Sequence, residues 1–78
     1  MKLTKAEKRA LIAVLDGKVF RRYTSEGNTL FSHAGNAPRV LWSLDRKKLM
    51  IDAKPDPQIK YQQLYRQVLT SAGAEELS

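Results

Sequence analysis

Residues 37–51, APRVLWSLDRKKLMI, decide the fold. Val40, Leu41 and Leu44 recur at helical spacing, and Pro38 is tolerated in the first turn of a helix. The pattern predicts a helix over residues 37–48 that runs into a short apolar strand at residues 49–51. The rest of the chain is placed around this helix and strand.

A second amphipathic helix is predicted near the start of the chain. Thr4 and Glu7 have the spacing of a capping box, in which each side chain bonds the backbone amide of the other residue. Gly17 is a typical C-terminal stop. The signals predict a helix over residues 5–16, with an apolar stripe formed by Ala10, Leu11, Val14 and Leu15.

A β-hairpin is predicted between the two helices. Residues 18–23 and 29–33 are short β-like runs, and residues 25–28, SEGN, are typical of a turn. Arg21 and Arg22 are consecutive, so in a strand they point to opposite faces. We expect one of them to be exposed beside the sheet and the other to cover its rim.

The last third of the chain allows two interpretations. Asp56 and Pro57 form a good helix start, which favours a helix over residues 57–72 that ends at Gly73. The alternative makes residues 58–62 a strand that pairs with residues 49–53 as a wing, with a helix beginning near Gln63. In both interpretations residues 1–73 form one winged-helix-like domain, and residues 74–78 are a frayed acidic tail.

The predicted fold class is therefore α+β, winged-helix-like, with three helices and a small antiparallel β-hairpin or sheet. A chain of 78 residues has a limited core. We expect that core to consist of Leu11, Val14, Leu15, Phe20, Leu30, Val40, Leu41, Leu44, Met50, Leu64 and Val68.

Positive charge is concentrated in the first two thirds of the chain. The net charge is +6, and residues 1–48 carry eleven Lys and Arg against four acidic residues. Residues 49–78 carry three Lys and Arg against four acidic residues. A one-sided basic region is typical of nucleic-acid binders. The alternative is an ordinary basic protein, since many small soluble proteins are basic and bind no nucleic acid.

The helix predicted at residues 37–48 carries a second, polar stripe. Arg39, Trp42, Ser43 and Arg46 follow at i, i+3, i+4 and i+7, opposite the apolar residues. Arg reads guanine or grips phosphate, and Ser bonds either backbone or base, so this stripe resembles a recognition helix. The candidate nucleic-acid-binding residues are Arg39, Trp42, Ser43, Arg46 and Lys47, with Lys18, Arg21 and Arg22 as further phosphate contacts.

That stripe also has a purely structural interpretation. Arg39, Ser43 and Arg46 could form a solvated face, and a lone Trp in a small domain usually packs at the edge of the core. We therefore expect Trp42 to pack on the hairpin or on the last helix.

Catalytic and metal chemistry are disfavoured. The chain has no Cys and a single His, which argues against thiolate or poly-His metal sites. Ser32 and His33 are neighbours on a predicted strand and face opposite ways, and no nucleophile–base pair is apparent. Asp45, Asp52 and Asp56 are expected to be solvated residues or caps. We expect no enzyme activity, no cofactor and no metal.

No stretch is apolar enough for a membrane span or a signal peptide, so a cytoplasmic protein without membrane contact is expected.

The first 51 residues resemble a known class of small proteins. An opening helix of the form L-[ST]-x-x-E, here Leu3, Thr4 and Glu7, precedes a Gly turn. Residues 44–50, LDRKKLM, look like a recognition helix that runs into the first strand of a wing. Together they are similar to small bacterial and phage winged-helix-like proteins, including the YjhX family described as toxins. Pro55 and Pro57 stand where a typical wing turn is expected, so the resemblance covers about residues 3–51.

The resemblance implies a compact α+β fold that contacts DNA or another macromolecule, and it implies no catalytic residue. Two functions are therefore expected to compete. The first is a DNA-binding regulator that uses the helix at residues 37–48 on duplex DNA. The second is a phage-type or bacterial interaction module or inhibitor that binds an acidic partner protein. Neither function requires a small-molecule substrate.

Overall fold

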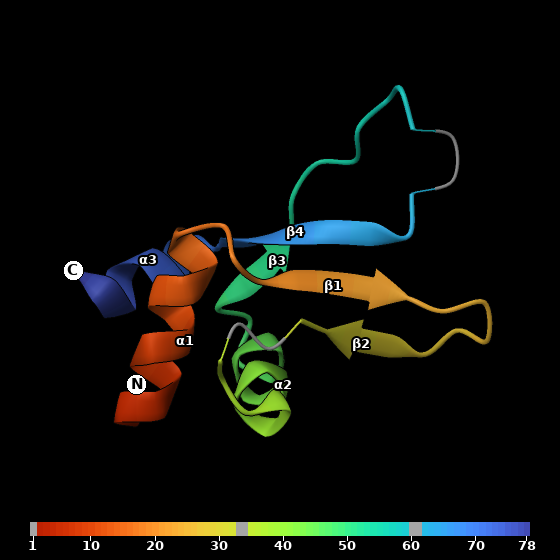
Figure 1. The fold of residues 1–78 in the computed structure, drawn as a ribbon. Helices are drawn as coiled ribbons and strands as arrows, with labels where there is room; N and C mark the ends of the chain where they lie inside the picture. Colours follow the sequence, from red (N-terminus) through yellow and green to blue (C-terminus); the bar gives the residue numbers. More distant parts are fainter. Residues whose placement is uncertain (1, 33–34, 60–61) are drawn as a thin grey trace.

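The computed structural model describes residues 2–32, 35–59 and 62–78, which form three helices and a four-stranded antiparallel sheet (Figure 1). The predicted α+β class with three helices is confirmed at this level. The elements in chain order are α1 (Lys5–Leu15), β1 (Phe20–Tyr23), β2 (Thr29–Phe31), α2 (Pro38–Arg46), β3 (Met50–Asp52), β4 (Leu64–Leu69) and α3 (Ser71–Leu77).

Helix α1 follows the prediction closely. Thr4 is its N-cap, and the capping box with Glu7 is formed in both directions, each hydrogen bond 3.1 Å long. The helix closes at Asp16, and Gly17 takes a φ of 74°, the left-handed conformation that glycine adopts without strain. One capped amphipathic helix is therefore specified by local sequence alone.

The predicted hairpin is also confirmed. β1 and β2 pair antiparallel, with Arg22 opposite Leu30. Ser32 accepts a hydrogen bond from the backbone amide of Phe20 at 2.8 Å, which closes the open end of the hairpin. The predicted second strand extended to His33, which lies outside the described residues.

Helix α2 begins after Ala37, with Pro38 in its first turn, and its C-cap is Lys47. Leu41 and Leu44 are completely buried, as predicted. Lys48 adopts a φ of 59°, and the following amide, that of Leu49, bonds the carbonyl of Leu44 at 3.0 Å. This left-handed turn ends the helix and directs the chain into β3.

The helix predicted over residues 57–72 is wrong, because residues 64–69 form strand β4. β4 lies in the middle of the sheet, whose order is β2-β1-β4-β3. The alternative interpretation named the correct neighbour, since β3 pairs with β4, but it placed the strand at residues 58–62. Residues 60 and 61 lie outside the described residues. Pairing with a strand on each side outweighs a helix-start signal at Pro57 that no packing supports.

The frayed tail predicted at residues 74–78 is wrong as well. Thr70 caps α3 by accepting a hydrogen bond from the amide of Gly73 at 3.1 Å, and the helix continues to Leu77. Leu77 packs against the core. Gly73 touches the backbone of Leu49 so closely that an added Cβ would lie 2.1 Å from the Leu49 carbonyl oxygen. The absence of a side chain at this position therefore allows α3 to dock.

The sheet has one covered and one open face. Arg21 lies opposite Phe31 and Tyr65 in the register, and Asp52 opposite Gln67, so these side chains share the covered face, against which α2 packs. The next residue along each strand points the other way. We call the other side the open sheet face; it carries Arg22, Leu30, Ile51, Leu64, Arg66 and Val68.

The core lies where α1, α2 and the start of β3 meet. Of the predicted core residues, Leu11, Val14, Leu41, Leu44 and Met50 are buried, and Phe20, Val40 and Val68 are half-buried. Leu15, Leu30 and Leu64 are exposed, so the prediction is wrong for them. The predicted inner face of β2 is wrong, because Phe31 is buried and Leu30 is exposed. Besides Phe31, the buried side chains that the prediction left out are Leu3, Glu7, Ala10, Ala13, Val19, Leu49 and Gln67.

Within the described ranges, no helix is long and apolar enough to cross a membrane.

Candidate nucleic-acid interface

The outer side of α2 presents three of the five residues that were predicted on this helix as nucleic-acid contacts. Arg39 and Arg46 are exposed, and they lie two turns apart on the same side of the helix, about 10 Å along its axis. Trp42 lies between them and is 42% exposed. Its ring packs edge-to-face on Phe31 with centroids 5.0 Å apart, so the prediction that Trp42 packs on the hairpin is confirmed. We call Arg39, Trp42 and Arg46 the α2 stripe.

Ser43 and Lys47, predicted as contact residues, are instead turned toward α1. The Ser43 hydroxyl donates to the Glu7 carboxylate at 3.0 Å, and Lys47 Nζ donates to the same oxygen at 2.5 Å. These two bonds join α1 to α2. Ser43 and Lys47 therefore hold the helix that carries the stripe and are only half-exposed themselves.

The buried carboxylate of Glu7 is held in its charged form. The hydrogen bond from Lys47, followed by the Thr4 amide, lowers the pKa of Glu7 from 4.5 to about 2. Burial acts in the opposite direction and Ser43 adds to the lowering. Glu7 is thus a charged hub shared by the α1 cap and the α1–α2 contact.

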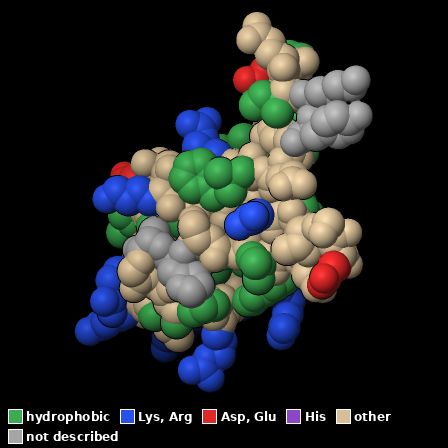
Figure 2. Space-filling model, turned by 45° about the vertical axis from the view of Figure 1, so that its right-hand side comes forward, with side chains coloured by type: hydrophobic (Ala, Val, Ile, Leu, Met, Phe, Trp, Pro, Cys, Tyr) green, Lys and Arg blue, Asp and Glu red, His purple; other side chains and the backbone are tan. Residues whose placement is uncertain are grey.

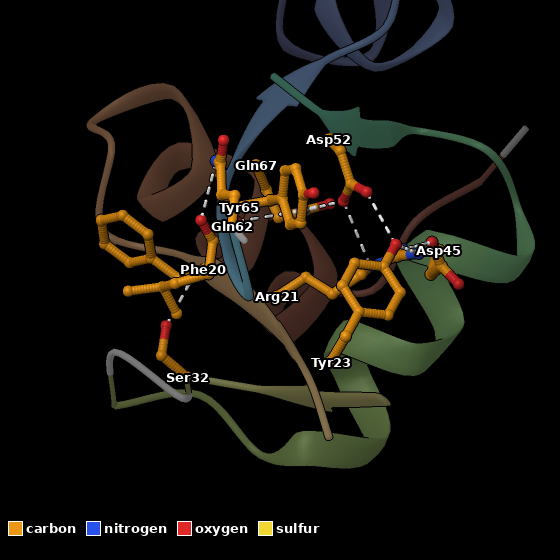
Figure 3. A network of polar contacts seen from close by, with 10 residues as sticks. Phe20, Arg21, Tyr23, Ser32, Asp45, Asp52, Gln62, Tyr65 and Gln67 are labelled. Atoms are coloured by element: carbon orange, nitrogen blue, oxygen red, sulfur yellow. Dashed lines mark hydrogen bonds and ion pairs between the residues drawn. The ribbon is translucent and has the colours of Figure 1, made fainter. Parts of the chain in front are cut away.

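Arg21, predicted as a phosphate contact, lies in a polar network beneath the sheet (Figure 3). Its guanidinium forms an ion pair with Asp45 of α2 and lies 3.4 Å from the Asp52 carboxylate of β3. The Tyr23 hydroxyl donates to Asp52 at 2.7 Å, and Gln67 Nε2 donates to Asp52 at 2.6 Å. Four elements, β1, α2, β3 and β4, are tied together by this network, so Asp45 and Asp52 are not the solvated residues that we expected.

The titration of the network follows from its burial and its charges. Burial disfavours the charged form of Arg21, but the hydrogen bond with Tyr23 and the charges of Asp45 and Asp52 outweigh this effect and raise its pKa. Burial also raises the pKa of Tyr23, and the hydrogen bond to Asp52 adds to the rise. The guanidinium stays charged and its donors face carboxylates, so it is not presented to a phosphate.

The remaining candidates are exposed but lie apart from one another. Arg22 is on the open sheet face, which α2 does not cover. Lys18 lines a shallow pocket of about 280 Å³ together with Arg9, Asp16 and residues 35–36, which lead into α2. Lys18 therefore lies near the residues that precede α2, whereas Arg22 lies on the other face of the sheet.

The space-filling view shows where the charges gather. Lys and Arg side chains project from the lower part of the molecule, at the level of α1 and α2 in Figure 1 (Figure 2). Further Lys and Arg side chains lie higher up, and the acidic side chains visible in this view lie at the top, at the upper left and at the right. Positive charge therefore reaches the surface at the level of α1 and α2, without a separate acidic side in this view.

Glu7 is a partner of two candidate residues, Ser43 and Lys47, that was not among the predicted site residues. A signal was available, because Glu7 precedes Ala10, Leu11 and Val14 by three, four and seven residues, which places it on the apolar stripe. A charged residue at such a position needs a partner in the core. Arg21 gave no comparable signal, because its partners come from segments far apart in the sequence.

No cluster suited to a metal ion was found: in the described part of the chain, no three His, Cys, Asp or Glu residues lie close enough together to hold one. His33 lies outside the described residues, and Asp56 accepts a hydrogen bond from the amide of Gln58 at 2.9 Å in a turn.

No family model, curated protein or solved structure matches this chain. The resemblance to winged-helix-like proteins of the YjhX type therefore stays a prediction.

Proposed function

We propose that this protein binds duplex DNA through the α2 stripe, as a small regulatory protein without enzymatic activity. The observation that carries the proposal is the arrangement of α2 itself. One side of the helix is anchored through Leu41, Leu44 and Asp45, and the opposite side leaves Arg39 and Arg46 exposed. A helix that enters the major groove needs an anchored inner side and an outer side with Arg donors.

The charge surroundings favour an anionic ligand at this place. Among the residues of α2, the one acidic side chain, Asp45, is committed to Arg21 on the inner side. Glu7, the nearest acid on α1, is neutralised by Lys47. No free carboxylate of α1 or α2 therefore competes with an approaching phosphate at the stripe. Lys18 and Arg9 add positive charge near the start of α2, which outnumbers the one carboxylate beside them, that of Asp16.

The order of elements agrees with a winged-helix-like arrangement, in which a recognition helix is followed by a two-stranded wing. Here α2 is followed by β3 and β4. The connection between them rises on the side of the sheet away from α2 (Figure 1). We therefore expect the contact to centre on α2, with the connection adding little.

The test is fluorescence anisotropy of a labelled DNA duplex at several salt concentrations. The expected dissociation constant is about 10⁻⁴–10⁻⁶ M at physiological salt for a random sequence. Each neutralised phosphate contributes about 0.9 to the slope of log affinity against log salt, so Arg39→Ala with Arg46→Ala should lower that slope by about two. Arg22→Ala with Arg66→Ala removes the same charge from the open sheet face and should leave the slope nearly unchanged.

Two results would contradict the proposal. Binding weaker than about 100 μM by the wild type would remove DNA as the ligand. Equal losses in the two double variants would show a diffuse charge effect without a defined surface. Circular dichroism melts of both variants establish beforehand that they are folded.

A further inference from the structure

The open sheet face carries exposed apolar side chains that no helix of the described chain covers. Leu30 is 54% exposed, Ile51 57% and Leu64 53%. They come from three strands, β2, β3 and β4, so they are spread across the whole sheet and not along one edge. Val68 lies opposite Ile51, and Arg22 and Arg66 interrupt the apolar side chains, so the face combines apolar and positively charged groups. Exposed apolar side chains gathered on one uncovered face are typical of an interaction site.

A groove continues this face toward the helices. It has a volume of about 360 Å³ and lies between the end of α1, strand β4 and the middle of α3. Leu15 and Val68 line it together with Arg66, and Leu15 is 64% exposed. Four of the seven exposed large hydrophobic residues of the described chain, Leu15 included, thus belong to the face and its groove.

Two arginines lie among these apolar residues. Arg22 stands in β1 between Leu30 and Leu64, its cross-strand neighbours, and Arg66 lies opposite Phe20. Both arginines are exposed, and the six residues that define the face include no acid. The surface is therefore apolar with two fixed positive charges near its centre.

We propose that the open sheet face binds an acidic amphipathic segment of a partner protein, whose apolar side chains cover Leu30, Ile51 and Leu64. The carboxylates of that segment pair with Arg22 and Arg66. Charge complementarity selects this occupant, since Arg forks bind carboxylates bidentately. Because the groove continues the face toward the helices, the two together can hold an extended peptide segment.

The other occupants fit less well. A second copy related by two-fold symmetry would bring the same surface against itself, and the arginines would meet without acids on that face. Single-stranded nucleic acid needs exposed aromatic rings for stacking, and the one aromatic residue that the described strands place on this side of the sheet, Phe20, is half-buried. The face lies on the far side of the sheet from α2, so this binding is independent of the α2 stripe.

The experiment selects ligands from a random peptide library displayed on phage, with the full chain immobilised. Enriched peptides should alternate acidic with Leu, Ile, Val or Phe residues. The best synthetic peptide is then titrated against Arg22→Glu with Arg66→Glu, which should bind at least tenfold more weakly, because a lost interfacial charge pair typically costs more than that factor. Arg39→Glu with Arg46→Glu has the same charge change and should bind within about twofold of wild type.

Two results would overturn the proposal directly. One is a selection that enriches no acidic peptide, and the other is equal weakening of peptide binding by the two double charge reversals. A concentration-dependent dimer in light scattering that Leu64→Ser abolishes would assign the face to a second copy instead. Binding of oligo(dT) that is lost in Arg22→Glu with Arg66→Glu would assign it to nucleic acid. Leu64→Ser also serves as a second variant of the face should the charge reversal disturb folding, and it too should weaken the peptide.

Discussion

Lys47 Nζ lies 2.5 Å from a carboxylate oxygen of Glu7, whose side chain is almost fully enclosed between α1 and α2. The two residues are 40 positions apart in the sequence, and their ion pair joins α1 to the end of α2. It also removes one lysine from the surface that the sequence assigned to nucleic acid. At the end of α2, Lys47 therefore contributes to the stability of the fold and its neighbour Arg46 to the proposed DNA contact. Single substitutions can test the two roles separately.

Lys47→Ala should mainly lower the stability of the fold, whereas Arg46→Ala should mainly lower the affinity for DNA. Lys47→Ala removes the main partner of the buried Glu7 carboxylate and should lower the free energy of unfolding by about 1.5–3 kcal/mol, the range for hydrogen bonds to charged groups. Arg46→Ala removes an exposed side chain and should change stability by less than about 0.5 kcal/mol. DNA affinity should fall more for Arg46→Ala, which removes a contact, than for Lys47→Ala, which leaves the Glu7 carboxylate without its ion pair. Urea unfolding and anisotropy on both variants measure this; a loss of stability in Arg46→Ala would contradict the assignment.

Glu7 should make the protein sensitive to acid. Its pKa is about 2 in the folded chain against 4.5 when unfolded, so the unfolded state binds the proton more readily. The contribution of Glu7 to stability is full above about pH 4.5 and is lost as the pH falls toward 2. Glu7→Gln should be less stable at neutral pH, and the difference from wild type should shrink over that window. Urea unfolding across the pH range tests this, and a constant difference would show that Glu7 is not the titrating group.

Leu44→Ala and Leu15→Ala should differ although the sequence placed both residues in the core. Leu44 is fully buried, so its truncation should cost about 2–5 kcal/mol. Leu15 is largely exposed, and its truncation should cost less than about 0.5 kcal/mol. Thermal melts of the two variants make the comparison. Equal melting temperatures would contradict the described packing of α1 and α2.

Gly73→Ala should destabilise the docking of α3. The new methyl group would lie 2.1 Å from the carbonyl oxygen of Leu49, a backbone atom that cannot turn away as a side chain can. Overpacking of this kind typically costs about 1–3 kcal/mol. Ala72→Ser, one residue earlier on an exposed position, is the control and should melt close to wild type. A Gly73→Ala protein as stable as that control would show that α3 docks differently.

Local signals predicted the first two thirds of the fold. The capping box at Thr4 and Glu7, the stop at Gly17 and the hairpin turn each act within a few residues, so the sequence around them was sufficient. Strand β4 could not be found in this way. Leu64, Tyr65 and Val68 satisfy a helical spacing as well as a strand, and β1 and β3, which flank β4 on either side, are distant in the chain.

The candidate site was predicted in part for the same reason. The exposure of Arg39 and Arg46 follows from the amphipathic pattern of one helix. The diversion of Arg21 to Asp45 and Asp52 depends on how α2 crosses the sheet, which no local pattern encodes. The choice between Leu30 and Phe31 as the buried residue depended on a one-residue register, where an error exchanges the two faces.

The most direct test of the central claim is a titration of the isotope-labelled protein with a short DNA duplex, followed by amide chemical shifts. DNA binding through the α2 stripe predicts that the largest amide shifts fall in residues 39–46 of α2 and their flanking residues, and that the Trp42 indole signal shifts as well. The amides of Arg22, Leu64 and Arg66 on the open sheet face should stay in place. Shifts centred on those three residues, or none at millimolar protein, would contradict the account.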